Sequence, residues 1–270
     1  MIIPDVTNPF FAGVYRGIED AALPRGYNVI LCNTDGSPDR ELSHLRMLGQ
    51  RRVDGIILAS AYLNDPSVGR LRAEGVAHVL VNRYSDEQKD AFVGSDDLAG
   101  GRMVTEHLIQ QGHRRIGHLA GLRSVSTSAL RYRGYHAALQ AAGLQPDPGL
   151  VAESGFMEEG GLRAALGLLA LPVDMRPTAI FAVNDLAALG VYAAARRLGL
   201  RIPRDLAVAG FNDIPIAARV EPGLTTIQVP IHEVGVVSAG LLIDQVESGA
   251  REPRRVIFAP QLVVRGSTAR

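Results

Sequence analysis

Lysine, cysteine and net charge are nearly absent from this sequence. Cys32 is the only cysteine among 270 residues, so an internal disulfide is impossible, and no Cys/His cluster has the spacing of a zinc site. Acidic and basic residues balance at 28 each, and Lys89 is the only lysine. Domains that grip nucleic acid usually show a basic excess or a basic stripe. We therefore expect that these residues alone do not hold DNA.

Long apolar runs are also missing. No run approaches the roughly 20 residues that a membrane-spanning helix needs, and no charged-then-apolar leader precedes the first strand. The single cysteine favours the cytoplasm. The sequence starts inside an apparent strand, at Met1 to Asp5, which predicts that an upstream region has been removed or left out.

Motifs of nucleotide-dependent and hydrolytic enzymes do not occur. There is no G-x-G-x-x-G after a strand, no P-loop and no G-x-S-x-G elbow. The histidines are scattered, without a pair at metal-binding helical spacing. We therefore expect no catalytic residue, no metal ligand, no cofactor and no enzymatic activity.

What the sequence does contain is an alternation of short β-rich runs with helical patterns, which is typical of βαβ units with a parallel sheet. Most runs are apolar throughout, as expected when helices cover both faces of the sheet. The predicted strands are Ile2–Ile3, Asn28–Cys32, Gly55–Ala59, His78–Val81, a short one at Phe92–Val93, Ile116–Ala120, Ala179–Val183, Leu206–Ala209 and Arg255–Val264.

The alternation of strands and helices is interrupted near residues 92–97 and again at residues 221–226, and it resumes after the first interruption. A chain of this length exceeds the usual size of one compact domain. The sequence therefore predicts an α/β protein with two similar lobes, each a parallel sheet flanked by helices, joined by several crossing segments. The N-terminal lobe is predicted to hold residues 1–96 and 227–255, and the C-terminal lobe residues 97–226 and 256–270.

A polar corner with two aromatics, Thr7 to Phe11, lies where the first strand gives way to a helix. In α/β proteins this corner is at the carboxyl edge of the sheet, where ligands bind. Pro9 fixes the local backbone and a loop is expected to keep Phe10 and Phe11 near the surface. We expect one or both rings to face a ligand, although they could simply plug the edge of the sheet.

Ordered motifs along nearly the whole chain give the sequence a family resemblance. It resembles the ligand-sensing core of the lactose-repressor (LacI/GalR) family of bacterial transcription regulators, which shares the periplasmic binding protein type I fold. The motifs are PDVTNPFF (4–11), RRVDGIIL (51–58), VNR (81–83), VGSDDLAGGR (93–102), HLIQQGHRRIGHLAG (107–121), STSALRYRGYHAALQAAG (126–143), PTAIFAVNDLAALG (177–190), DLAVAGFNDIPIA (205–217) and LTTI (224–227).

The resemblance implies a cytoplasmic repressor core that binds a sugar or sugar-derived effector in a cleft between the lobes. It also implies a homodimer, allosteric coupling by hinge motion of the lobes, and operator DNA bound through an N-terminal helix-turn-helix that is not in this sequence. The alternative is a periplasmic sugar-binding protein of an ABC transporter, which would use the same cleft. A signal peptide encoded upstream, instead of a helix-turn-helix, would distinguish it.

The resemblance also implies which residues line the cleft. Sugar recognition uses aromatic faces for C–H patches, and amides or guanidinium groups for hydroxyls. Arg131 would reach the ligand as a fork of donors. The predicted ligand-binding residues are Asn8, Phe10, Phe11, Asn82, Arg83, Arg131, Phe156, Asn184 and Asn212.

Structural roles are open for several of these residues and their neighbours. Asn184 and Asp185 open a helix, where Asn and Asp are common caps. Asp213 fits a turn beside Pro215, and Arg83 could be solvated in a loop. Asp96 is expected to cap the helix that starts near Leu98.

Two of the predicted residues depart from the family pattern. Sugar-binding relatives commonly have Asp where this sequence has Asn82 and Asn212, so negative charge is missing beside Arg83 and Arg131. A buried, unbalanced arginine pair is costly. We therefore hypothesise an anionic effector, such as a sugar acid or a sugar phosphate, with a neutral sugar still possible. Asp97 or Asp213 could instead balance the charge internally.

Overall fold

Two compact units make up the chain in its computed structural model, which describes residues 1–85 and 89–269. Unit 1 comprises Met1–Ser95 and Pro230–Phe258, and unit 2 comprises Asp96–Val229 and Ala259–Arg270. The chain therefore passes from one unit to the other after Ser95, after Val229 and after Phe258. The sequence had placed these passages after residues 96, 226 and 255.

Unit 1 contains a six-stranded sheet, in the order β11-β5-β4-β3-β1-β2, in the described part of the chain. All its pairings are parallel. The strands are β1 (Ile2–Ile3), β2 (Cys32–Asn33), β3 (Ile56–Leu58), β4 (His78–Val81), β5 (Ala91–Ser95) and β11 (Arg255–Phe258). The helices are α1 (Pro9–Ala22), a 3₁₀ turn (Leu23–Arg25), α2 (Pro38–Gln50), α3 (Pro66–Ala73) and α8 (Ile231–Ser248).

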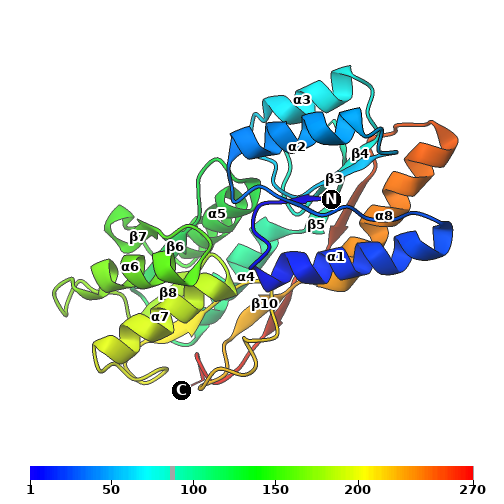
Figure 1. Cartoon of the computed structure of the whole chain (residues 1–270). Helices are drawn as coiled ribbons and strands as arrows, with labels where there is room; N and C mark the ends of the chain where they lie inside the picture. Colours follow the sequence, from blue (N-terminus) through cyan, green and yellow to red (C-terminus); the bar gives the residue numbers. More distant parts are fainter. Residues whose placement is uncertain (86–88, 270) are drawn as a thin grey trace. The chain divides into compact units, whose positions relative to one another are not determined.

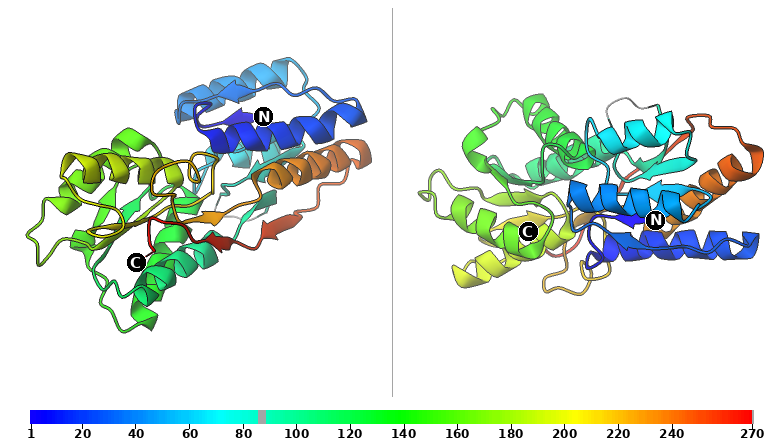
Figure 2. Two further views of the ribbon diagram at one scale, coloured as in Figure 1. Left: turned by 90° about the horizontal axis from the view of Figure 1, so that it is seen from below. Right: turned by 45° about the horizontal axis from the view of Figure 1, so that its top comes forward.

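Helices cover both faces of this sheet. The helices α2 and α3 pack on one face, where Leu45, Leu48, Val68 and Leu71 join the core formed by the strands. On the other face, α1 and α8 lie side by side (Figure 2). This burial on both sides explains why the strands are apolar at consecutive positions.

Unit 2 is built on a parallel sheet in the order β7-β6-β8-β9, with a separate antiparallel pair, β10-β12. The helix α4 packs with α5, and α6 packs with α7 (Figure 1). The strands are β6 (Ile116–Ala120), β7 (Val151–Glu153), β8 (Ala179–Ala182), β9 (Ala207–Ala209), β10 (Thr226–Gln228) and β12 (Gln261–Val263). The helices are α4 (Asp97–Gln110), α5 (Ser126–Ala141), a 3₁₀ turn (Pro148–Leu150), α6 (Glu158–Leu169) and α7 (Asp185–Arg197).

The predicted architecture of parallel sheets flanked by helices is confirmed, but two predicted strands are wrong. Only Cys32 of the predicted strand Asn28–Cys32 is in β2, because β1 offers pairing partners only at Cys32 and Asn33. The predicted strand Arg255–Val264 is two strands, β11 and β12. Pro260 lies between them and has no N–H for a ladder, and the two strands belong to different units.

Close packing of α1 against α8 depends on glycine. A Cβ on Gly17 would lie 2.0 Å from the carbonyl oxygen of His232, and one on Gly235 would lie 2.1 Å from that of Val14. We expect Gly17→Ala to lower the free energy of unfolding by about 1–3 kcal/mol, because the two helix backbones must separate. Gly240→Ala, also in α8 and with nothing within 4 Å, is the matched control. It should stabilise by up to about 1 kcal/mol through helix propensity.

Thermal unfolding of the two variants tests this packing. The midpoint should fall for Gly17→Ala and rise slightly for Gly240→Ala. Equal shifts in the two variants would show that the α1–α8 contact does not require glycine.

Candidate functional site

The carboxyl edge of the unit 1 sheet carries the predicted site residues of that unit. Asn8, Phe10 and Phe11 follow β1, and Asn82 and Arg83 follow β4 directly. Because β1 and β4 run parallel in one sheet, their carboxyl ends lie along the same edge. Ligands of α/β proteins bind outside this edge.

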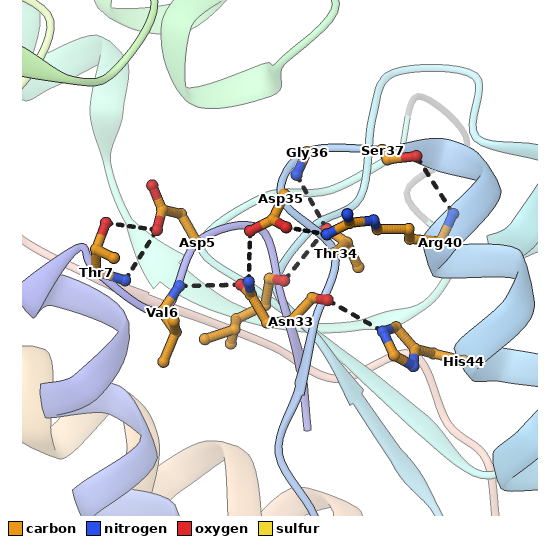
Figure 3. A network of polar contacts seen from close by, with 11 residues as sticks. Asp5, Val6, Thr7, Asn33, Thr34, Asp35, Gly36, Ser37, Arg40 and His44 are labelled. Atoms are coloured by element: carbon orange, nitrogen blue, oxygen red, sulfur yellow. Dashed lines mark hydrogen bonds and ion pairs between the residues drawn. The ribbon is translucent and has the colours of Figure 1, made fainter. Parts of the chain in front are cut away.

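Hydrogen bonds from the neighbouring strand hold the loop between β1 and α1 in place (Figure 3). Asn33, at the end of β2, accepts a bond of 2.9 Å from the Val6 N–H through Oδ1 and donates one of 2.5 Å to Asp35 through Nδ2. Thr7 donates twice to Oδ1 of Asp5, from its N–H and its hydroxyl. His44 of α2 contacts the Asn33 carbonyl at 3.0 Å. The loop therefore delivers Asn8 in a defined position.

Phe10 and Phe11 lie in the first turn of α1 rather than in a loop. Asn8 caps this helix, since its Oδ1 accepts from the Phe10 N–H at 3.1 Å, and Pro9 is the first helical residue. The two rings meet edge to face at 5.3 Å and are only 2% and 3% exposed. The prediction that a loop keeps both rings near the surface is therefore wrong. Their contact with a ligand stays a prediction.

Asn82 and Arg83 occupy the turn that ends β4. Asn82 has a φ of 62°, a left-handed conformation in which Asn is favoured over most other residues. This conformation gives a structural reason for an amide at this position. Arg83 is buried, at 6% exposure, which excludes the alternative of a solvated loop arginine.

A buried carboxyl group lies in the electrostatic range of Arg83. Glu41 of α2 is 2% exposed and accepts a 2.5 Å hydrogen bond from the Ser60 hydroxyl. Burial raises the pKa of Glu41, while Ser60 and the Arg83 charge act to lower it. Glu41 is thus a buried acid of unit 1 that was not recognised in the sequence.

In unit 2, the structure brings the predicted residues together in two hydrogen-bonded pairs. Asn184 follows β8 and Asn212 follows β9, while Arg131 is on α5 and Phe156 follows β7. Arg131 donates to Asn212 Oδ1 at 3.5 Å, and Asn184 donates to the Phe156 carbonyl at 2.9 Å. β7, β8 and β9 belong to one parallel sheet, so Phe156, Asn184 and Asn212 lie along its carboxyl edge.

Arg131 is the centre of a buried polar network. It is 3% exposed and forms an ion pair of 2.7 Å with Asp97, and it donates to the Val183 carbonyl at 2.7 Å. Its guanidinium also lies 3.7 Å from the centre of the Phe211 ring. Burial raises the pKa of Asp97 to about 6, and Arg131 acts against this shift. Of the two internal counter-charges left open by the sequence, Asp97 is the partner of Arg131.

Asn184 and Asp185 both have structural roles. Asn184 caps α7 by accepting from the Ala187 N–H at 2.8 Å. Asp185 is fully buried and accepts from the Thr226 hydroxyl at 2.6 Å and the Ile214 N–H at 2.9 Å. Asp185 therefore ties α7 to the loop after β9 and to β10, a long-range function that no local sequence pattern indicates.

The other acids near the site also have internal partners. Asp213 has a φ of 58° and forms an ion pair of 2.7 Å with Arg265. Gln228 donates to Asp213 at 3.2 Å, and a backbone bridge joins it to Asn212. Gln228 therefore lies next to a predicted site residue, although it was not itself predicted from the sequence. Asp96 caps α4 by accepting from the Ala99 N–H, which confirms the predicted cap.

The buried carboxyl of Asp185 makes stability depend on pH. Burial raises its pKa from 3.8 to about 7, although the Thr226 and Ile214 hydrogen bonds oppose the shift. Between about pH 4 and 7 the folded protein then binds more protons than the unfolded chain, so this contribution to stability falls as pH rises. Each pKa unit corresponds to about 1.4 kcal/mol. Asp185→Asn should therefore lose less stability than the parent between pH 5 and pH 8.

Denaturant midpoints at the two pH values measure this difference. Other titrating groups, Asp97 included, are common to both proteins and cancel in the comparison. An identical pH dependence in parent and variant would contradict a raised pKa at Asp185.

The described residues include neither a cluster that could hold a metal ion nor a helix that could span a membrane. Within residues 1–85 and 89–269, no three His, Cys, Asp or Glu side chains are grouped so that they could hold a metal ion. In the same ranges, no helix has the length and apolar character needed to cross a membrane.

Comparison with known proteins places the chain in a family. Residues 105–268 match the family model of the periplasmic binding protein-like domain. The chain is 36% identical over 270 residues to a ribose operon repressor of Halalkalibacterium halodurans, covering 99% of this chain and 78% of that protein.

Solved structures show the same relationship. A LacI family transcriptional regulator from Enterococcus faecium with bound ribose has a TM-score of 0.88 and 31% identity, with 99% of this chain and 97% of that one covered. A transcriptional regulator CelR–cellobiose complex has a TM-score of 0.91 and 32% identity, with coverage of 98% and 83%. The chain belongs to the LacI family of transcriptional regulators, of which it forms the effector-sensing core, and its relatives are repressors rather than enzymes or transporter components.

Proposed function

We propose that this core senses a small, uncharged sugar of the pentose class and controls transcription as a cytoplasmic repressor. The ribose operon repressor and the ribose-bound regulator support the ligand class. The binding residues are Asn8, Phe10, Phe11, Asn82, Arg83, Arg131, Phe156, Asn184 and Asn212.

Internal charge compensation is the observation that carries the choice of a neutral effector. Arg131 forms a buried ion pair with Asp97. A buried arginine that already has a carboxylate partner needs no anionic ligand to offset its charge. The guanidinium of Arg131 can still donate to sugar hydroxyls, because it presents several N–H groups. The reason for expecting a sugar acid or sugar phosphate is therefore removed for Arg131.

Transcriptional control requires coupling between the effector and DNA. We propose a homodimer that binds operator DNA through a helix-turn-helix outside these 270 residues. The effector changes DNA affinity only if it binds one conformation of the protein more tightly than another. By linkage, operator DNA then changes the affinity for the sugar by the same factor.

Titration calorimetry with matched ligands tests the proposal. Ribose should bind, while ribose 5-phosphate and ribonic acid should bind at least about tenfold more weakly, which is about 1.4 kcal/mol. Tighter binding of the charged ligands than of ribose would show that the site prefers an anionic effector. Binding of none of the three would overturn the assignment to pentoses, and cellobiose and purines would be the next ligands to test.

A further inference from the structure

The turn after β9 carries Asn212 in a backbone conformation that needs support. Asn212 has a φ of 113° and Asp213 a φ of 58°, so two consecutive residues other than glycine lie at positive φ. Asn and Asp tolerate this region better than most residues, but two in succession keep it only where surrounding contacts hold them. Asn212 is also one of the proposed sugar-binding residues, so the contacts that hold the turn fix the position of its amide.

Backbone hydrogen bonds to β10 and the residue after it hold Asn212. The Asn212 N–H donates to the Ile227 carbonyl at 2.8 Å, and the Val229 N–H donates to the Asn212 carbonyl at 3.3 Å. These bonds fix the backbone of Asn212 on both sides of its α-carbon. Neither of them includes Asp213, the second residue at positive φ.

Asp213 is held through its carboxylate. Arg265, which follows β12, forms an ion pair of 2.7 Å with Asp213 Oδ1, and Gln228 donates to Oδ2 at 3.2 Å. The side chains of Arg265 and Asp213 are only 21% and 10% exposed. Because a partly buried ion pair is screened less than a pair on the open surface, it can contribute to holding the turn.

Arg265 is itself fixed to the residues that directly precede β10. Its Nη1 donates to the Leu224 carbonyl at 2.8 Å, and its backbone N–H donates to the Thr225 hydroxyl at 2.9 Å. The guanidinium therefore joins this segment to the turn after β9 through two different nitrogens. A lysine has a single nitrogen and does not reproduce a fork of this kind.

We propose that Arg265 is a positioning residue of the sensor: through the Asp213 carboxylate, it holds the Asn212 amide in the orientation that sugar binding requires. This role rests on the proposed function, because Asn212 is one of the proposed binding residues. In this role Arg265 does not contact the sugar, and its whole effect on affinity passes through Asn212.

A double-mutant cycle measured by titration calorimetry tests this role. Arg265→Met should weaken ribose binding about tenfold, and the affinity of Arg265→Lys should lie between that of Arg265→Met and that of the parent. In an Asn212→Gly background the amide is gone and glycine tolerates the backbone conformation. There, Arg265→Met should change the affinity less than about twofold. A substitution that merely destabilised the protein would weaken binding equally in both backgrounds.

Amide hydrogen exchange without sugar tests the geometry independently. Arg265→Met should speed exchange at Asn212 and Val229, whose N–H groups are bonded across the turn, by about tenfold or more. Asp213→Asn keeps a residue that tolerates positive φ but loses the charge, so its effect should be smaller. Arg201→Met is the matched control, because it breaks an exposed ion pair with Asp205 before β9. It should change neither the exchange at these two amides nor the affinity for ribose.

Two results would overturn the positioning role. Exchange at Asn212 and Val229 that is the same in Arg265→Met as in the parent would show that Arg265 does not hold the turn. An equal loss of ribose affinity in the parent and Asn212→Gly backgrounds would show that Arg265 acts elsewhere. A parent protein that does not bind ribose would instead overturn the proposed function, and the exchange experiment would still decide whether Arg265 holds the turn.

Discussion

Arg131→Met should abolish sugar binding and lower the free energy of unfolding by about 3–5 kcal/mol, the range measured when one partner of a buried ion pair is removed. The substitution leaves the Asp97 carboxylate without its partner inside the protein and deprives the Val183 carbonyl of a donor. It also removes the N–H group that contacts Asn212. Both the binding residues and the core of unit 2 are thus affected by one change.

A double variant separates binding from folding. In Arg131→Met/Asp97→Leu the whole ion pair is replaced by apolar side chains, which is often close to neutral for stability. We expect its denaturant midpoint to return toward that of the parent while ribose binding remains undetectable by calorimetry. Parent-like affinity in the double variant would show that Arg131 does not contact the sugar. A single variant as stable as the parent would contradict the buried ion pair.

Phe10→Ala should lower the free energy of unfolding by about 3–5 kcal/mol, which is typical for removing a buried phenyl ring. Phe10 is 2% exposed and its ring packs against that of Phe11 at the start of α1. If Phe10 also covers a face of the sugar, the affinity for ribose should fall together with the stability. Urea denaturation and calorimetry on the same preparation measure the two effects.

Two controls show whether the loss of affinity is specific. Ile18→Ala removes another buried side chain of α1, about two turns from Phe10 toward the C-terminal end of the helix, where no predicted site residue lies. It should cost about 2–5 kcal/mol and leave the affinity for ribose unchanged below its unfolding transition. Phe10→Leu should be destabilised less than Phe10→Ala and should still bind ribose, although more weakly than the parent. Equal affinity loss in Ile18→Ala and Phe10→Ala would indicate a purely structural role for Phe10.

The apolar strands were the most predictable part of the fold. The strands His78–Val81 and Ile116–Ala120 were predicted with the bounds that the structure has. Both are interior strands of parallel sheets, so their sequence is governed by burial on two faces. The order of motifs was enough to identify the family.

Strand bounds that depend on a distant partner were not predictable. Residues 28–31 have a strand-like composition, but a ladder forms only where β1 lies opposite, at Cys32 and Asn33. The segment from Arg255 to Val264 pairs first with β5 and then with β10. No local pattern shows that one apolar run serves two units.

In the candidate site, too, local features were predictable and long-range partners were not. Residue types that suit a sugar could be recognised one by one, but their internal partners could not. Asp97 is 34 positions from Arg131 in the sequence, and Asp185 is 41 positions from Thr226. Such partners decide whether an arginine is available to balance an anion, so the hypothesis of an anionic effector could be weighed only once the structure was known.

The left-handed backbone at Asn82 and Asn212, with φ values of 62° and 113°, limits how this sensor can change its specificity. Few residues other than Asn, Asp and Gly adopt positive φ without strain. Exchanging Asn for Asp swaps an NH₂ donor for an acceptor oxygen and leaves the chain path intact. If Asn82 and Asn212 contact the sugar as proposed, single exchanges of nitrogen for oxygen at these positions should distinguish sugars that differ in one hydroxyl, and a small library at these two codons is the natural starting point for a redesigned biosensor.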